Sequence, residues 1–164
     1  VRPDLDGSLA SELDDASLAA AYTAVAGPGA VLTLNNAKRA TYSGTVNLGN
    51  VIDRDVQHVV NALWQAGAEA ISINDIRITN RTAIRNAGNA ILVDYQPISV
   101  PIHIRAVGDP VAMHNNFTGL PEWDELSQLR DRYRIRWSYA ASKHLELPAG
   151  VSVLPAHATT KGNA

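Results

Sequence analysis

The sequence contains no cysteine among its 164 residues. This absence excludes disulfide bonds, thiol catalysis and metal sites with thiolate ligands. Aromatic residues make up only 5% of the chain, so we expect a core built from aliphatic side chains. No run approaches the roughly 18 apolar residues of a membrane helix, and the first residues do not match a signal peptide. We therefore expect the chain to be a fragment, with any membrane anchor lying outside it.

Neither sign of charge dominates the chain. Fourteen Lys and Arg residues stand against sixteen Asp and Glu residues, for a formal net charge of -2. This balance argues against a protein that binds nucleic acid or an anionic membrane over its whole surface, and it leaves local patches open. The length fits one domain with a proper core.

The first part of the chain predicts a helix, a strand and a loop. Residues 8–26 are rich in alanine with apolar residues at helical spacing, and Gly27-Pro28-Gly29 follows as a strong breaker of helices. Residues 30–36 alternate as a strand does. Residues 37–50 are polar and contain glycine, which predicts a mobile loop.

The clearest helix in the sequence spans residues 53–67. Asp53 is placed to cap its beginning and Gly67 to end it, while valine and leucine form a stripe along one side. A strand at 69–73 follows directly, and we expect Ile71 and Ile73 to face the same core as the stripe.

The second half predicts further strands and one more long helix. Residues 76–98 indicate a strand-rich excursion, and residues 100–110 a strand whose end, Asp109-Pro110, is typical of a helix cap. Residues 121–132 predict a helix, and the alternation of residues 133–139 predicts a half-buried strand.

Without the first helix and the excursion, the order of elements is β-α-β-β-α-β. This is the split βαβ arrangement of ferredoxin-like domains, an α+β fold with an antiparallel sheet and helices on one face. We expect residues 1–27 to form an N-terminal helix, residues 28–155 a single globular domain, and residues 156–164 a flexible tail.

No pattern of reactive groups indicates catalysis, so we expect a protein that is not an enzyme and has no cofactor or metal. Asp53, Asp55 and His58 resemble metal ligands, but only two of them share a helix face, and acidic residues in a first turn are expected for capping. His103 and His114 have no nucleophile placed beside them in any catalytic motif.

Two groups of polar residues are candidate interaction sites. In the first, Asn74 and Asp75 fit a structural turn after the strand, while Arg77, Arg81 and Arg85 recur every four residues. The arginines form either a solvated rim of weak ion pairs or a site for an anion or a protein partner.

The second group lies on the side of the predicted sheet that faces away from the helices. Its members are Thr33, His103, Arg105, Arg134 and Arg136. RNA binding would require exposed aromatic residues for base stacking, and Trp137 and Tyr139 are predicted to face the core. We therefore expect no nucleic-acid partner, and a protein partner or the excursion to cover this face.

The chain resembles the bacterial domain-of-unknown-function family numbered 881. The resemblance rests on "LWQAGAEAISINDIRIT", "AIRNAGNAILVDYQPISVPIHIRAVGDP" and "VAGPGAVLTLNN", and it covers roughly residues 22–155. It implies a domain on the outer face of the bacterial cell membrane, carried on an N-terminal membrane anchor and a helical stalk, and encoded near division or sporulation functions. It carries over no catalytic residue.

The resemblance leads to a leading hypothesis and one alternative. The first is a non-catalytic envelope domain that binds division or cell-wall proteins, with a homodimer through a sheet edge or the stalk left open. The alternative is a sensory module that binds a small anion at Arg77, Arg81 and Arg85.

Overall fold

The protein is an α+β domain with three helices and ten strands within residues 21–151, and the described residues before them, 7–9, 11, 12 and 16, are also helical. The computed structural model describes residues 7–9, 11, 12, 16 and 21–151. The helices are α2 (Asp53–Gln65), α3 (Pro110–Thr118) and α4 (Pro121–Tyr133). The strands are β1 (Val25–Asn35), β2 (Tyr42–Ser43), β3 (Val46–Asn47), β4 (Ala70–Ile73), β5 (Ile76–Arg77), β6 (Ile84–Ala87), β7 (Ala90–Val93), β8 (Gln96–Ile98), β9 (Ile102–Val107) and β10 (Arg136–Leu147).

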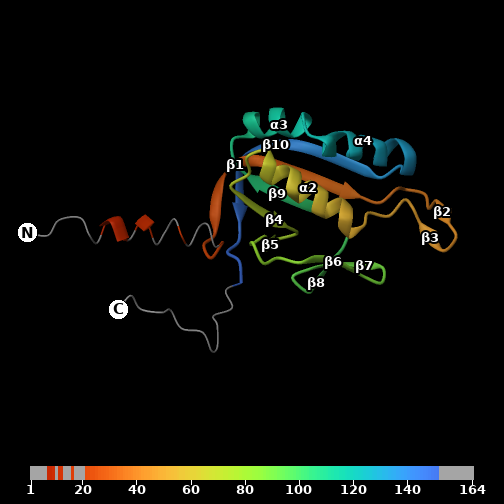
Figure 1. Cartoon of the computed structure of the whole chain (residues 1–164), viewed down its shortest axis with the longest axis horizontal. Helices are drawn as coiled ribbons and strands as arrows, with labels where there is room; N and C mark the ends of the chain where they lie inside the picture. Colours follow the sequence, from red (N-terminus) through yellow and green to blue (C-terminus); the bar gives the residue numbers. More distant parts are fainter. Residues whose placement is uncertain (1–6, 10, 13–15, 17–20, 152–164) are drawn as a thin grey trace, which may run out of the picture.

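The main sheet has the strand order β10-β1-β9-β4-β5 (Figure 1). Every neighbouring pair in it is antiparallel. The excursion predicted at residues 76–98 is confirmed as strand-rich: β5 joins the main sheet, while β6-β7-β8 form a separate three-stranded sheet. β2 and β3 form a hairpin of their own. β10 and β5 are therefore the two edges of the main sheet.

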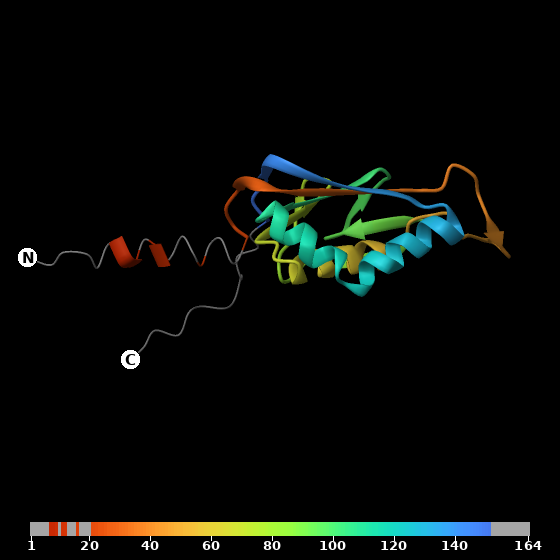
Figure 2. The same cartoon turned by 90° about the horizontal axis from the view of Figure 1, so that it is seen from above.

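The helices cover one face of the main sheet, as the view from above shows (Figure 2). The predicted stripe of α2 packs in one core with β4, and Val59, Leu63, Ile71 and Ile73 are at most 1% exposed. The sheet β6-β7-β8 joins the same core from the side of α2, where Gln57 Nε2 donates to the carbonyl of Ile84 at 2.6 Å. Helices and excursion thus share one core that is mostly aliphatic, as the composition predicts, with Phe117 as its buried aromatic residue.

The N-terminal prediction needs correction, because β1 begins earlier than expected. Val25 and Ala26, placed in the predicted helix, are the first residues of β1, and Ala21 is a turn residue with a φ of 61°. Earlier in the predicted helix, the described residues 8, 9, 11, 12 and 16 are helical as predicted, and its residues 10, 13–15 and 17–20 lie outside the described residues. The sequence predicts Pro28 to break a helix, and in the structure it lies inside β1. The strand tolerates it because β9 ends at Val107, opposite Gly29, and the carbonyl of Pro28 still accepts a bond from the N–H of Gly108.

The predicted strand at 133–139 begins three residues too early. Tyr133 ends α4, and Arg134 follows it with a φ of 61°, the left-handed conformation that stops a helix. β10 begins at Arg136 and continues to Leu147. The alternation of tyrosine, isoleucine and tryptophan therefore spans a helix end and a strand start, and Arg134 lies at a corner and not on a strand.

Residues 37–50 contain more structure than the predicted loop. The hairpin β2–β3 is held at its base by Asn47, whose Oδ1 accepts from the N–H groups of Thr41 and Gly49 at 3.0 Å each. The N–H of Ala37 donates to the carbonyl of Gly49 at 2.8 Å. These bonds hold the hairpin as a defined projection from the domain.

The chain enters and leaves the domain at one end. Val25 at the start of β1 pairs with Leu147 at the end of β10, and the N–H of Gly150 donates to the carbonyl of Ala21 at 2.7 Å. The β2–β3 hairpin lies at the opposite end in both views (Figures 1 and 2). We call the end where the two terminal segments meet the tethered end, and the opposite end the distal end.

Candidate functional site

The corner after α2 is built by backbone hydrogen bonds. Gly67 has a φ of 107°, a conformation that favours glycine. Its N–H donates to the carbonyl of Trp64, and the N–H of Ala68 donates to that of Leu63, which together form a Schellman cap. Gly67 ends the helix as the sequence predicts. The cap at the other end is corrected: Asp53 is the first residue of the helix, Ile52 holds the cap position, and the N–H of Ile52 donates to Asp55.

Asn74 and Asp75 are the two turn residues of the β4–β5 hairpin. Both have positive φ, 43° and 66°, as a two-residue hairpin turn requires. Asn74 Oδ1 accepts from the N–H of His103 at 2.8 Å, and its Nδ2 donates to the carbonyl of Ser99 at 3.2 Å. Asp75 forms an ion pair with Arg105. These two residues are therefore a structural corner that joins β4 to β5 and is bonded to β9.

Arg77 lies inside the protein, where it binds both terminal segments. It is 3% exposed, and its Nη1 donates to the carbonyls of Thr23 at 2.9 Å and Pro148 at 3.0 Å. Burial lowers the pKa of its guanidinium. Its Nε and the facing Ser72 Oγ make no hydrogen bond with any described residue. Arg77 is therefore a clamp at the tethered end, hidden from solvent.

Arg81 and Arg85 are exposed, so they do not share a surface with Arg77. The guanidinium of Arg85 lies 5.3 Å above the ring of Tyr95, in the β7–β8 turn. Asp94 accepts from the hydroxyl of Thr82 and the N–H of Ala83. The three arginines thus do not converge, and the anion site predicted from their spacing lacks its first member.

The polar face predicted on the sheet is present in part. Thr33 and His103 are neighbours on β1 and β9, with Oγ1 and Nδ1 3.2 Å apart. Arg136 Nε donates to the carbonyl of Asn36 at 3.0 Å. Arg134, exposed at the end of α4, lies beyond this face. The structure therefore divides the predicted group between the middle of the sheet and its distal corner.

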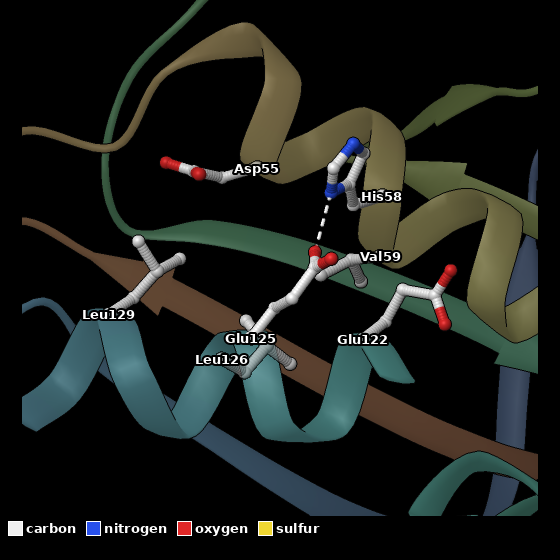
Figure 3. Close-up of a pocket in the computed structure, with 7 residues that line it drawn as sticks. All are labelled: Asp55, His58, Val59, Glu122, Glu125, Leu126 and Leu129. Atoms are coloured by element: carbon white, nitrogen blue, oxygen red, sulfur yellow. Dashed lines mark hydrogen bonds and ion pairs between the residues drawn. The ribbon is translucent and has the colours of Figure 1, made fainter. Parts of the chain in front are cut away.

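A small cavity lies between α2 and α4 (Figure 3). Its volume is about 20 Å³, which holds roughly one water molecule and excludes a substrate. Its lining consists of Asp55, His58, Val59, Glu122, Glu125, Leu126 and Leu129. His58 Nδ1 is 2.7 Å from Glu125 Oε2, and Glu122 Oε2 has no hydrogen-bond partner among the described residues. Across those residues no three His, Asp or Glu side chains are grouped to hold a metal ion.

Asp55 at this cavity gives the protein a predictable dependence on pH. Burial raises the pKa of its carboxyl, against the opposing effects of the Ile52 N–H and of His58. A carboxyl with a raised pKa in the folded state stabilises most below its ordinary value, and this stability is lost as pH rises through the raised value. We expect Asp55→Asn, which keeps an acceptor for Ile52, to gain stability relative to the wild type between pH 3 and pH 7.

Chemical unfolding at both pH values measures this gain. Asp53→Asn removes the same charge from the same helix end and serves as the control, because Asp53 does not line the cavity. If the difference in the free energy of unfolding between Asp55→Asn and the wild type stayed constant with pH, the raised pKa of Asp55 would be contradicted.

No local pattern in the sequence marks the outer edge of β10, which is the longest of the described strands. Among the described strands, only β1 pairs with it. Two hydrogen bonds fix which backbone groups of β10 point outward: Asn74 donates to the carbonyl of His103, and Gly108 donates to the carbonyl of Pro28. In an antiparallel sheet successive residues direct their N–H and C=O groups to opposite neighbours, so these bonds and the strand registers set the direction of each residue across β9, β1 and β10. Residues 137, 139 and 141 therefore face outward, and Arg130 Nη2 donates to the carbonyl of Trp137 from that side at 3.1 Å.

Helices α3 and α4 run along this edge (Figure 1). Tyr139 of β10 stacks on Phe117 with ring centroids 5.6 Å apart, and Trp123 meets Trp137 edge-on at 5.0 Å. Burial raises the pKa of the Tyr139 hydroxyl, which has no partner among the described residues. The edge is thus fixed in place by an aromatic cluster while its outer backbone groups at 139 and 141 remain unpaired there.

Known proteins resemble the chain in sequence and in structure. It is 41% identical over 159 residues to UPF0749 protein Rv1823 and UPF0749 protein MT1871 of Mycobacterium tuberculosis, covering 91% of this chain and 51% of each relative. UPF0749 protein YlxW of Bacillus subtilis is 33% identical over 86 residues, covering 52% of this chain and 37% of the relative. The chain thus spans about half the length of the mycobacterial relatives.

A crystal structure of an uncharacterized conserved protein from Mycobacterium tuberculosis has the same fold, with a TM-score of 0.71 and 22% identity over 92% of this chain and 99% of that one. Within the described residues, no helix has the length and apolar character needed to cross a membrane. The family model for bacterial proteins of unknown function matches residues 12–158. The chain therefore belongs to the DUF881 family of bacterial proteins, as its motifs predict.

Proposed function

We propose that this chain is the non-catalytic, extracytoplasmic domain of a membrane-anchored envelope protein and serves as a scaffold for division or cell-wall proteins. The observation that carries the proposal is the unpaired outer edge of β10. An edge strand of this kind pairs with an extended segment of another protein through backbone hydrogen bonds, which extend the sheet by one strand.

The two ends of the domain support this role. Both terminal segments meet at the tethered end, where Arg77 binds the carbonyls of Thr23 and Pro148. A domain held from one end leaves its β10 edge and its distal end accessible to partners. An N-terminal anchor upstream of this chain, as the family resemblance implies, would connect to the domain at that tethered end.

We also infer that the core of the domain follows the ferredoxin-like split βαβ order. In this assignment β1, α2 and β4 form the first half, and β9, the α3–α4 pair and β10 form the second. The sheet order β10-β1-β9-β4 supports it, with β5 as an added edge strand. Such a sheet presents its last strand as an edge, which is where the proposed docking takes place.

Site-specific photo-crosslinking in cells tests the docking role. A photoreactive residue at Lys143, exposed beside the edge, is expected to trap division or cell-wall proteins when it is placed in the full-length protein. Ala141→Pro removes an outward N–H and no bond to β1, so it should reduce the adducts at least about tenfold while the domain stays folded.

Two controls make the crosslinking result specific. Ala140→Pro, one residue earlier, removes an N–H that faces β1, so it should lower the melting temperature of the domain where Ala141→Pro does not. The photoreactive residue at exposed Arg81 should not trap the same proteins. Adducts that persist in Ala141→Pro, or that contain no envelope protein, would contradict the proposal.

A further inference from the structure

The distal end of the domain concentrates positive charge on a chain whose total charge is slightly negative. Two short segments, 36–52 and 130–136, carry six of the fourteen Lys and Arg residues and a single acidic residue, Asp131. The six are Lys38, Arg39, Arg130, Arg132, Arg134 and Arg136. All are exposed, and none forms an ion pair with a residue of the described chain.

The fold brings these two segments to the same place. Asn35 pairs with Arg136, and Arg136 Nε donates to the carbonyl of Asn36, so the root of the β2–β3 hairpin lies beside the corner between α4 and β10. Both views show this hairpin and this corner at the end of the domain away from the termini (Figures 1 and 2). We call the six basic residues and the hairpin the distal tip.

The hairpin adds exposed apolar side chains to the charge of the distal tip. Tyr42 is 68% exposed and Val46 is 60% exposed. Tyr42 and Ser43 are successive in β2, so they face opposite sides, and Val46 lies directly opposite Ser43. Tyr42 and Val46 therefore project from opposite faces of a narrow tongue.

This geometry distinguishes between two kinds of anionic partner. A protein surface that is flat would cover only one of the two side chains, whereas a fluid interface surrounds both. Tyrosine, small apolar groups and neighbouring basic residues form the composition that lipid headgroup regions accept, with the cations against anionic headgroups. We propose that the distal tip binds an anionic lipid surface, with Tyr42 and Val46 inserted among the headgroups and Lys38 and Arg39 against their phosphates.

The proposal goes beyond the docking role of β10 and does not depend on it. It also differs from an anchor in the membrane, because the tip lies at the opposite end from the terminal segments. The inserted side chains and the basic residues each contribute only weakly to membrane binding. Binding of the distal tip is therefore expected to be reversible and to weaken as salt screens the charges.

The absence of cysteine gives a direct test with the whole 164-residue chain. Ser43→Cys creates a unique site at the tip for a fluorophore that responds to its surroundings. The emission should shift to the blue with vesicles that contain phosphatidylglycerol and not with vesicles of phosphatidylcholine alone. In this labelled background, Lys38→Ser/Arg39→Ser should weaken the binding to the vesicles about 30-fold, because each cation near an anionic surface strengthens binding about fivefold and the two factors multiply.

Two further variants separate charge from insertion. Tyr42→Ser/Val46→Ser keeps all charges and should lose the blue shift. Arg81→Ser/Arg85→Ser removes two exposed cations elsewhere and should bind like the wild type. The proposal is overturned if phosphatidylglycerol vesicles give no binding, or if the Lys38/Arg39 and Arg81/Arg85 variants weaken it equally. A response to soluble polyglutamate without one to vesicles would overturn it in favour of an acidic protein.

Discussion

Arg77→Ala should destabilise the domain by about 3 kcal/mol or more, a large part of the stability of a protein of this size. The substitution removes two hydrogen bonds from a cation, to the carbonyls of Thr23 and Pro148, and leaves a cavity where a 3% exposed side chain was. Because both acceptors belong to the terminal segments, the loss should be greatest at the tethered end.

Urea unfolding measures the total loss, and hydrogen exchange locates it. The amide of Gly150, bonded to Ala21, should exchange faster in Arg77→Ala than in the wild type. Arg81→Ala removes an exposed arginine four residues away and should change stability by no more than about 0.5 kcal/mol. Equal effects of the two substitutions would show that Arg77 is not the clamp described.

Gly29→Ala is the second substitution with a large expected effect. A Cβ on Gly29 would lie 1.9 Å from the carbonyl oxygen of Ala106 and 3.0 Å from Cα of Val107. Both atoms belong to the backbone of β9, so no side-chain rotation relieves the clash, and β1 must move away from β9. We expect a loss of roughly 3 kcal/mol or more, or a chain that does not fold.

Gly119→Ala is the matched control for this prediction. Gly119 has a φ of -87°, and a Cβ there would come no closer than 3.5 Å to any neighbour. Its melting temperature should stay within a few degrees of that of the wild type. A Gly29→Ala protein as stable as Gly119→Ala would mean that β1 and β9 are not packed as closely as described.

Local signals in the sequence predicted the parts of the fold that depend on neighbours in the chain. The stripe of α2, the end of that helix at Gly67, the alternation of β9 and the cap at Asp109 are each specified within a few residues. Asp109 indeed accepts from the N–H groups of Val111 and Ala112, and Pro110 begins α3. These features follow from helical and strand periodicity.

The errors lie where distant parts of the chain decide the structure. Val25 is in a strand and not in a helix because β10, more than a hundred residues later, pairs with it. Arg134 looks like a strand residue by alternation, but the packing of α4 extends the helix to Tyr133. Propensity and pattern give way to tertiary contacts at such positions.

The difference between local signals and distant contacts also separates the candidate residues whose place follows from the sequence from those whose place does not. The corner at Asn74 and Asp75 was predicted as structural from turn chemistry, and its bonds fit that interpretation. The burial of Arg77 had no local signal, since its partners lie 54 and 71 residues away. The distal tip was also hidden, because its two basic segments are separated by most of the domain and meet only through β1 and β10.

No described strand pairs with the outer edge of β10, and the proposed function requires this edge to be free for a partner. Hydrogen exchange measured by NMR at single residues tests it in the isolated chain. The account predicts fast exchange for the outward amides of Tyr139 and Ala141, and slow exchange for those of Ser138 and Ala140, which face β1. Equal, strong protection of all four amides would contradict it, because the edge would then already be occupied.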